Sequence, residues 1–291
     1  MVVNKHGSFY MRSGWGTKII QAIELDDAIF APANEAEAID NIGVGRVMIK
    51  AMRYWSDVMG LTIEKKSNNI IKKIPTDLCK LIETYDPYFQ KNGTLLLMHR
   101  NTIKNIDEAT AWYWLFNEWK GQTITKEAFV DGLHGFLTVN GMTIKKDAVE
   151  KEFNCVKQTY IKEKKFDLKT LLDEDTYPLL GPINALTFDK DKGLIKKHLS
   201  NREIPTELLI YSIAMDNPSE SSGNKQMNID RLMEESGQVG KYFNMRYSDL
   251  LDMLLEAENK GYIGLNNNFG NRFIEFNDTK YCDLQKKYYI D

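Results

Sequence analysis

Basic side chains gather in one stretch of the sequence and share one side of a predicted helix. Arg46, Lys50 and Arg53 stand at positions i, i+4 and i+7 of the segment 44–59, whose apolar residues recur with a helical period. The three cations therefore lie on one face, opposite an apolar stripe that we expect to be buried. Side chains of this kind bind phosphates, because neutralising a phosphate releases the counterions that surround nucleic acid.

A short β-hairpin is predicted directly after this helix. Residues 61–63 and 70–74 are strand-like and flank a polar turn. The hairpin contributes four lysines that we expect to reach phosphates beside the helix: Lys65, Lys66, Lys72 and Lys73. From residue 44 to 73, seven basic residues stand against two acidic ones, a local balance of +5 in a chain whose net charge is −3. A partner that carries phosphates should prefer this segment.

The elements around these cations predict a mainly α fold with small β-hairpins. Helices over 15–24, 34–41 and 44–59 followed by the hairpin give the order of a winged helix-turn-helix unit. Near the other end, helices over 206–215, 229–235 and 248–259 precede a second hairpin of 261–265 and 272–276. We therefore predict an N-terminal winged helix-turn-helix domain (1–84), a helical middle domain (85–203) and a C-terminal winged-helix-like domain (204–291).

Other residue patterns offer no assembled catalytic or metal site. The four histidines are isolated, and no nucleophile motif is visible. The Gly43-Val44-Gly45 turn lacks the features of a nucleotide-binding loop, so a turn between helices is favoured over a phosphate cradle. Cys155 is expected in the core. The acidic run Asp173-Glu174-Asp175 fits a solvated face better than a nuclease metal site. We predict a protein without enzymatic activity, cofactor or metal.

An aromatic cluster lies in the middle region, at Trp112, Trp114, Phe116 and Trp119. Aromatic rings stack on nucleic-acid bases, but the interleaved basic residues of such sites are missing here. Burial in the core or at a domain interface is therefore the favoured interpretation.

Length and composition are those of a folded protein of two or three domains. The chain has 291 residues, of which 43% are hydrophobic. No apolar run is long enough to cross a bilayer, and the three cysteines lie far apart. We expect a cytoplasmic protein that does not contact a membrane.

Several segments together resemble the bacterial family called domain of unknown function 4007. The most specific is Gly43-Val44-Gly45-Arg46 followed by Arg53-Tyr54-Trp55. Others follow in order along nearly the whole chain: residues 7–15, 86–88, 94–99, 114–117, 240–243, 250–255 and 261–263.

The resemblance implies a biological setting more than a chemistry. Members of this family look like components of bacterial anti-phage gene clusters, often beside a sulfurtransferase resembling phosphoadenosine phosphosulfate reductases. Such clusters concern DNA sulfur modification (phosphorothioation) or related defence. The resemblance implies no enzymatic activity. In this setting, the local charge of +5 and the winged order lead us to expect an accessory subunit that binds double-stranded DNA, or bridges DNA and other defence proteins such as that sulfurtransferase.

Three alternatives remain open. The basic helix face fits DNA, an acidic or phosphorylated protein partner, or simply a solvated surface. A protein-interaction scaffold without DNA binding and a transcription regulator of the defence operon are the alternative functions. Self-association into a homo-oligomer is compatible with each of them.

Overall fold

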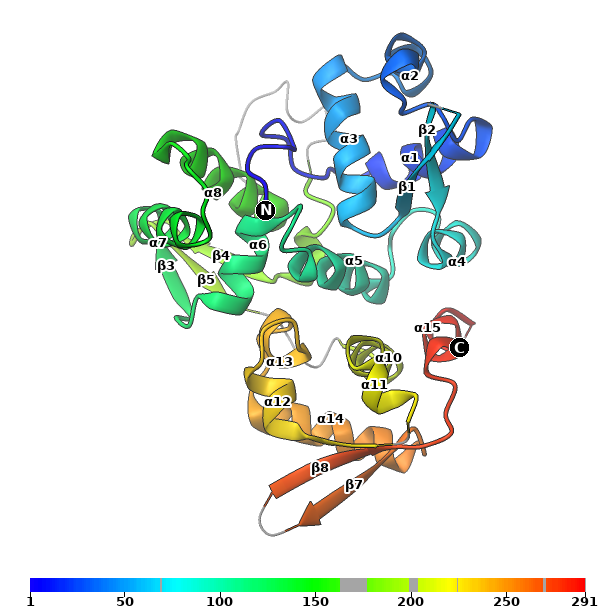
Figure 1. The fold of residues 1–291 in the computed structure, drawn as a ribbon, viewed down its shortest axis with the longest axis vertical. Coiled ribbons are helices and arrows are strands. Elements are labelled where there is room, and N and C mark those ends of the chain that lie inside the picture. Colours follow the sequence, from blue (N-terminus) through cyan, green and yellow to red (C-terminus); the bar gives the residue numbers. More distant parts are fainter. Residues whose placement is uncertain (69, 163–176, 199–203, 224, 269–270, 291) are drawn as a thin grey trace. The chain divides into compact units, whose positions relative to one another are not determined.

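The computed structural model describes residues 1–68, 70–162, 177–198, 204–223, 225–268 and 271–290. Its contacts divide the chain into two units (Figure 1). Unit 1 comprises residues 1–115 and 121–198, and unit 2 comprises residues 116–120 and 199–291. The fold is mainly α with small antiparallel sheets, as predicted. The predicted N-terminal domain and most of the predicted middle domain fall in unit 1, and the predicted C-terminal domain falls in unit 2. The division into three domains stays a prediction.

Unit 1 begins with helices and a hairpin in the predicted order. Helices α1 (Trp15–Leu25), α2 (Glu35–Ile42) and α3 (Arg46–Val58) precede strands β1 (Thr62–Ser67) and β2 (Ile70–Pro75). The strands pair antiparallel as a two-stranded sheet, and α4 (Asp77–Tyr85) follows. Thr76 caps α4, because its hydroxyl oxygen accepts the N–H of Cys79.

The second half of unit 1 contains a three-stranded sheet that the sequence analysis did not predict. Helices α5 (Asn92–Lys104) and α6 (Thr110–Tyr113) precede strand β3 (Thr123–Thr125), then α7 (Lys126–Val139) and α8 (Lys146–Tyr160). Strands β4 (Leu186–Asp189) and β5 (Leu194–Lys197) complete the sheet in the order β3-β5-β4. Strand β4 is therefore an edge strand.

Unit 2 has a related order, in which a short strand is followed by helices and then a hairpin. Helices α10 (Thr206–Asp216) and α11 (Pro218–Ser221) precede strand β6 (Gln226–Asn228). Helices α12 (Ile229–Glu234), α13 (Val239–Tyr242) and α14 (Tyr247–Asn259) lead to strands β7 (Ile263–Asn268) and β8 (Asn271–Phe276), and α15 (Tyr281–Ile290) closes the unit. The strand order β6-β8-β7 matches β3-β5-β4, since the first strand of each sheet pairs with the last.

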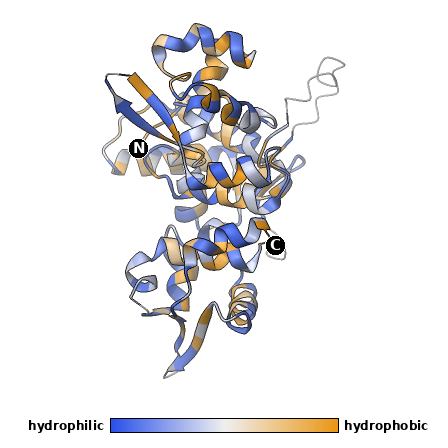
Figure 2. Cartoon of the chain, turned by 90° about the vertical axis from the view of Figure 1, so that its right-hand side faces the viewer, coloured by the Kyte–Doolittle hydropathy of each residue, from blue (hydrophilic) through white to orange (hydrophobic). Residues whose placement is uncertain are grey.

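Aromatic side chains fill the core of unit 1. Trp15, Trp55 and Trp112 are at most 1% exposed, and the rings of Trp55 and Trp112 meet edge to face. Of the predicted aromatic cluster, Trp112, Trp114 and Phe116 are buried, as expected, whereas Trp119 is half-buried. Figure 2 shows that the helices carry both hydrophilic and hydrophobic residues, as expected of amphipathic helices that cover a core. Among the described residues, no helix combines the length and the apolarity needed to cross a membrane.

Candidate nucleic-acid interface

Helix α3 presents its cations on one side because the other side is buried. Met52 and Trp55 are inaccessible to solvent, and the Trp55 indole N–H donates to the Phe9 carbonyl at 2.7 Å. The side chains of Arg46 and Lys50 are 69% and 64% exposed, whereas that of Arg53 is 27% exposed. Two of the three predicted cations therefore project well into solvent.

The glycine turn before α3 has a structural explanation. Gly43 has a φ of 72°, a left-handed conformation that favours glycine, and its N–H donates to the Ile39 carbonyl at 3.0 Å. Gly45 is extended, and its carbonyl accepts the N–H of Ile49 at 3.1 Å inside the first turn of α3. The turn ends one helix and starts the next, which was the favoured interpretation.

One carboxylate of α2 holds both exposed cations of α3. Glu35 Oε1 lies 2.7 Å from Arg46 Nε, and Glu35 Oε2 lies 3.5 Å from Lys50 Nζ. Ion pairs this exposed contribute only about 0.2–1 kcal/mol each. A phosphate that approaches α3 therefore competes with Glu35 for two cations at a small energetic cost.

The hairpin adds lysines beside the helix. Lys65 and Lys66 are exposed on β1. Lys72 lies directly across from Lys65 in the sheet and forms an ion pair with Asp27 at 2.9 Å. We refer to the six cations Arg46, Lys50, Arg53, Lys65, Lys66 and Lys72 as the α3 patch.

Lys73 does not belong to this patch, and its prediction as a phosphate contact is wrong. Its side chain is 1% exposed and bonds to Asp57 of α3 and, at 3.1 Å, to Glu64 of β1. Arg53 also reaches Glu64, at 2.9 Å. Burial would raise the pKa of Glu64, but the hydrogen bonds from Arg53 and Lys73 outweigh it and lower that pKa. This cluster joins the hairpin to α3.

The folded chain reduces the local positive charge without removing it. The α3 patch and Lys73 together carry seven positive charges. Their ion-pair partners Asp27, Glu35, Asp57 and Glu64 carry four negative charges, so a net charge of +3 remains. Two of these carboxylates come from outside the segment 44–73, and for this reason the sequence count of +5 was higher.

The histidines have structural partners that lie far away in the sequence. His6 Nε2 lies 3.1 Å from Glu152 Oε1, and both side chains are buried. His99 Nδ1 lies 2.8 Å from the Tyr160 hydroxyl, and His134 Nε2 lies 3.1 Å from the Ile144 carbonyl. In the described part of the chain, no three His, Cys, Asp or Glu side chains gather as a metal site.

Two candidates of the sequence remain, Cys155 and an acidic run. Cys155 is buried, as expected, and burial raises its thiol pKa well above the ordinary value. The acidic run Asp173-Glu174-Asp175 lies outside the described residues.

The chain belongs to the family described as "Protein of unknown function (DUF4007)", whose model matches residues 3–289. This match confirms the family resemblance. A magnesium-ion-bound SspB crystal structure is similar, with 20% identity and a TM-score of 0.85, over 99% of this chain and 88% of that chain. A second SspB crystal structure has 19% identity and a TM-score of 0.84 over the same shares. At this identity the likeness shows the fold. Among curated proteins there is no match.

Proposed function

We propose that this protein is a non-catalytic, DNA-binding accessory subunit of a bacterial anti-phage system concerned with DNA sulfur modification, and that it bridges DNA and partner proteins. The family supports the setting, because the resemblance implies defence gene clusters. The α3 patch supports the DNA contact. The neighbouring sulfurtransferase that the resemblance implies is the partner we propose first.

We interpret the repeated order of helices and a hairpin as winged helix-turn-helix units. In such a unit the helix before the hairpin enters the major groove, and the hairpin contacts the phosphate backbone. Helix α3 with β1 and β2 fits these roles at the N-terminus, and α14 with β7 and β8 has the same order of a helix and a hairpin in unit 2. The segment from β3 to β5 has the same strand order and would be a third such unit.

A single observation carries the proposal of DNA binding. Arg46 and Lys50 stand one helical turn apart on α3, and both are about two-thirds exposed. The following hairpin also exposes Lys65 and Lys66, whose side chains point to its two opposite faces. The two elements that a winged unit uses to contact DNA therefore both carry exposed cations.

Helix α14 supports the second part of the proposal, the contact with partner proteins. It contains four carboxylates and no basic residue: Asp249, Asp252, Glu256 and Glu258. A helix with this charge repels phosphates, so its unit is better suited to a basic protein surface. This helix is also the observation that favours the alternative function, a scaffold without DNA affinity.

One of the two similar SspB structures holds a magnesium ion. In the described part of this chain, no three metal-ligating side chains come together, and we assign no residue to a metal.

DNA binding is tested by fluorescence anisotropy with a labelled duplex over a range of salt concentrations. We expect the full-length protein to bind, and Arg46→Ala/Lys50→Ala to weaken binding and reduce the slope of log K against log salt by about 1.8. The matched control is Lys126→Ala/Lys146→Ala, which removes two exposed, ion-paired cations of unit 1 outside the α3 patch.

Equal binding by the parent and Arg46→Ala/Lys50→Ala at every salt concentration would refute DNA binding through α3. Absence of duplex binding together with co-purification of defence proteins would favour the scaffold. A footprint confined to the promoter of the operon would favour a transcription regulator.

A further inference from the structure

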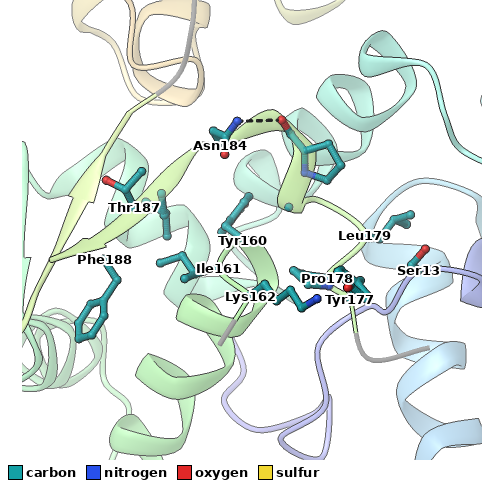
Figure 3. Close-up of a pocket in the computed structure, with 13 residues that line it drawn as sticks. Ser13, Tyr160, Ile161, Lys162, Tyr177, Pro178, Leu179, Asn184, Thr187 and Phe188 are labelled. Atoms are coloured by element: carbon teal, nitrogen blue, oxygen red, sulfur yellow. Dashed lines mark hydrogen bonds between the residues drawn. The ribbon is translucent and has the colours of Figure 1, made fainter. Parts of the chain in front are cut away.

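A pocket in unit 1 lies beside the edge strand β4, and none of its lining residues belongs to the α3 patch. It has a volume of about 540 Å³, which falls within the range of about 300–1,000 Å³ of small-molecule sites. Figure 3 shows it between the end of α8 and the segment 177–188, with the side chain of Lys162 alongside Tyr177 and Pro178.

Aromatic rings and one lysine, Lys162, line this pocket, and Lys157 lies outside the lining. Lys162 Nζ lies 3.1 Å from the centroid of the Tyr177 ring, and Lys157 Nζ lies 4.6 Å from the centroid of the Phe188 ring. Tyr177 is 46% exposed, so its ring borders solvent. Tyr160 forms a fixed wall, because it is buried and its hydroxyl bonds to His99 at 2.8 Å. Two aromatic surfaces therefore each have a cation next to them.

Polar groups complete the lining. The hydroxyls of Ser13 and Thr187 and the amide of Asn184 can hydrogen-bond to a ligand, and Asn184 and Thr187 are exposed. The lining residues that the structure describes include no carboxylate. The pocket thus offers flat apolar surface, positive charge and neutral hydrogen-bonding groups.

We propose that this pocket binds a nucleotide unit, with its base stacked on Tyr177 and its phosphate held by Lys162. A nucleotide joins a flat aromatic ring to an anion, and both parts find their complement here. The ammonium of Lys162 leaves the face of Tyr177 and pairs with the phosphate, and the base takes its place on the ring. The nucleotide is either free or part of single-stranded DNA. Both sources present the same chemistry.

The neighbouring hairpin favours a strand as the source. The turn between β4 and β5 carries Lys190 and Lys192, and Lys196 of β5 lies directly across from Thr187 in the sheet. All three lysines are exposed. They would contact the phosphates that follow a nucleotide bound in the pocket.

The test uses the full-length chain with Arg46→Ala/Lys50→Ala, which removes the two most exposed cations of α3. Binding of labelled (dT)12 is measured by anisotropy, and binding of free dTMP by calorimetry. Tyr177→Leu should weaken (dT)12 binding by about tenfold through the lost stacking. Lys162→Met should reduce the salt slope by about 0.7, the value for one phosphate of a single strand.

Matched controls keep the residue type and change the place. Tyr88→Leu alters a 73% exposed tyrosine outside the pocket, and Lys151→Met alters an exposed lysine of α8. Both should leave binding unchanged. Circular dichroism checks that each variant is folded.

The outcomes separate this site from the proposed duplex contact. If dTMP binds and its binding is weakened by substitution of Tyr177 and Lys162, the pocket binds free nucleotides. If only the binding of (dT)12 depends on these residues, the pocket binds single-stranded DNA. Binding that ignores both substitutions, or no binding by either probe, overturns the proposal. These outcomes do not affect the proposal that α3 binds duplex DNA, because duplex binding is measured separately with the parent protein.

Discussion

The ion pairs of Glu35 predict a substitution that strengthens DNA binding, whereas loss of a cation would weaken it. Glu35→Gln keeps the size of the side chain and removes the charge that holds Arg46 and Lys50. If α3 binds DNA, both cations become available to phosphates without first breaking a bond. The variant should therefore bind duplex DNA more tightly than the parent.

The size of this effect follows from the exposure of the two pairs. Arg46 is 69% and Lys50 64% exposed, so each pair contributes about 0.2–1 kcal/mol, the range for solvated ion pairs. Removing the competition at both cations should strengthen DNA binding by about 0.4–2 kcal/mol, or about two- to thirtyfold. The free energy of unfolding should fall by no more than the same small amount.

Anisotropy titrations with one duplex at fixed salt measure the difference. The control is Glu37→Gln, which removes the same charge from the same helix at an exposed position. It separates release of the bound cations from a general change in net charge. Equal tightening by both variants would show that charge alone acts, and no tightening by Glu35→Gln would refute a phosphate contact at Arg46 and Lys50.

Three further predictions concern the stability and the thiols of the fold. Lys73→Met should lower the free energy of unfolding in urea by about 1.5–3 kcal/mol, because it leaves two carboxylates without their shared donor, whereas the exposed Lys66→Met should change it little. The folded-state pKa of Glu64 is lowered, so its contribution to stability is present above its ordinary pKa of 4.5 and is lost as the pH falls through the lowered value; Glu64→Gln should remove this acid dependence from urea titrations between pH 3 and pH 7. Cys282 is exposed and should react with a thiol reagent at pH 8 in the native protein, whereas burial raises the pKa of Cys79 to about 12 and should protect it until denaturant is added.

The elements around the α3 patch could be predicted because their signals are local. The apolar period of 44–59 predicted a helix that the structure places at Arg46–Val58, and the turn after it predicted the hairpin of β1 and β2. The same reasoning located α14 and its hairpin in unit 2. Period and turn chemistry depend only on residues a few positions apart, so they are visible in a single sequence.

The wrong prediction for Lys73 concerns the alternation of side chains along a strand. Successive side chains of a strand point to opposite faces, so Lys72 and Lys73 lie on opposite faces of the hairpin. The register places Lys73 opposite Glu64, on the face that packs toward α3. The exposed Lys66 shares the face of Lys73, so the two-residue period separates Lys72 from Lys73 but does not show which of them is buried.

Other features could not be predicted because they join distant segments. The sheet of β3, β5 and β4 is built from strands of three or four residues, too short to show a period, and β3 pairs with a strand about 70 positions later. The pair of His6 and Glu152 spans 146 positions. Neither contact leaves a local pattern, and both depend on how the helices between them pack.

The charge distribution has a consequence for the salt dependence of DNA binding. The chain carries −3 in total, and the α3 patch with Lys73 and the four paired carboxylates carries +3, so the rest of the chain carries −6. At 0.15 M salt, screening over about 8 Å hides this remainder from DNA bound at α3, whereas at 0.01 M the range is about 30 Å and the remainder repels. The exposed cations of the patch are Arg46, Lys50, Lys65 and Lys66. If each contacts one phosphate, the slope of log K against log salt is about −3.6 near 0.15 M. The slope should become shallower toward 0.01 M. A straight line with the full slope down to 0.01 M would show that the remaining acidic charge lies too far from the bound DNA to repel it.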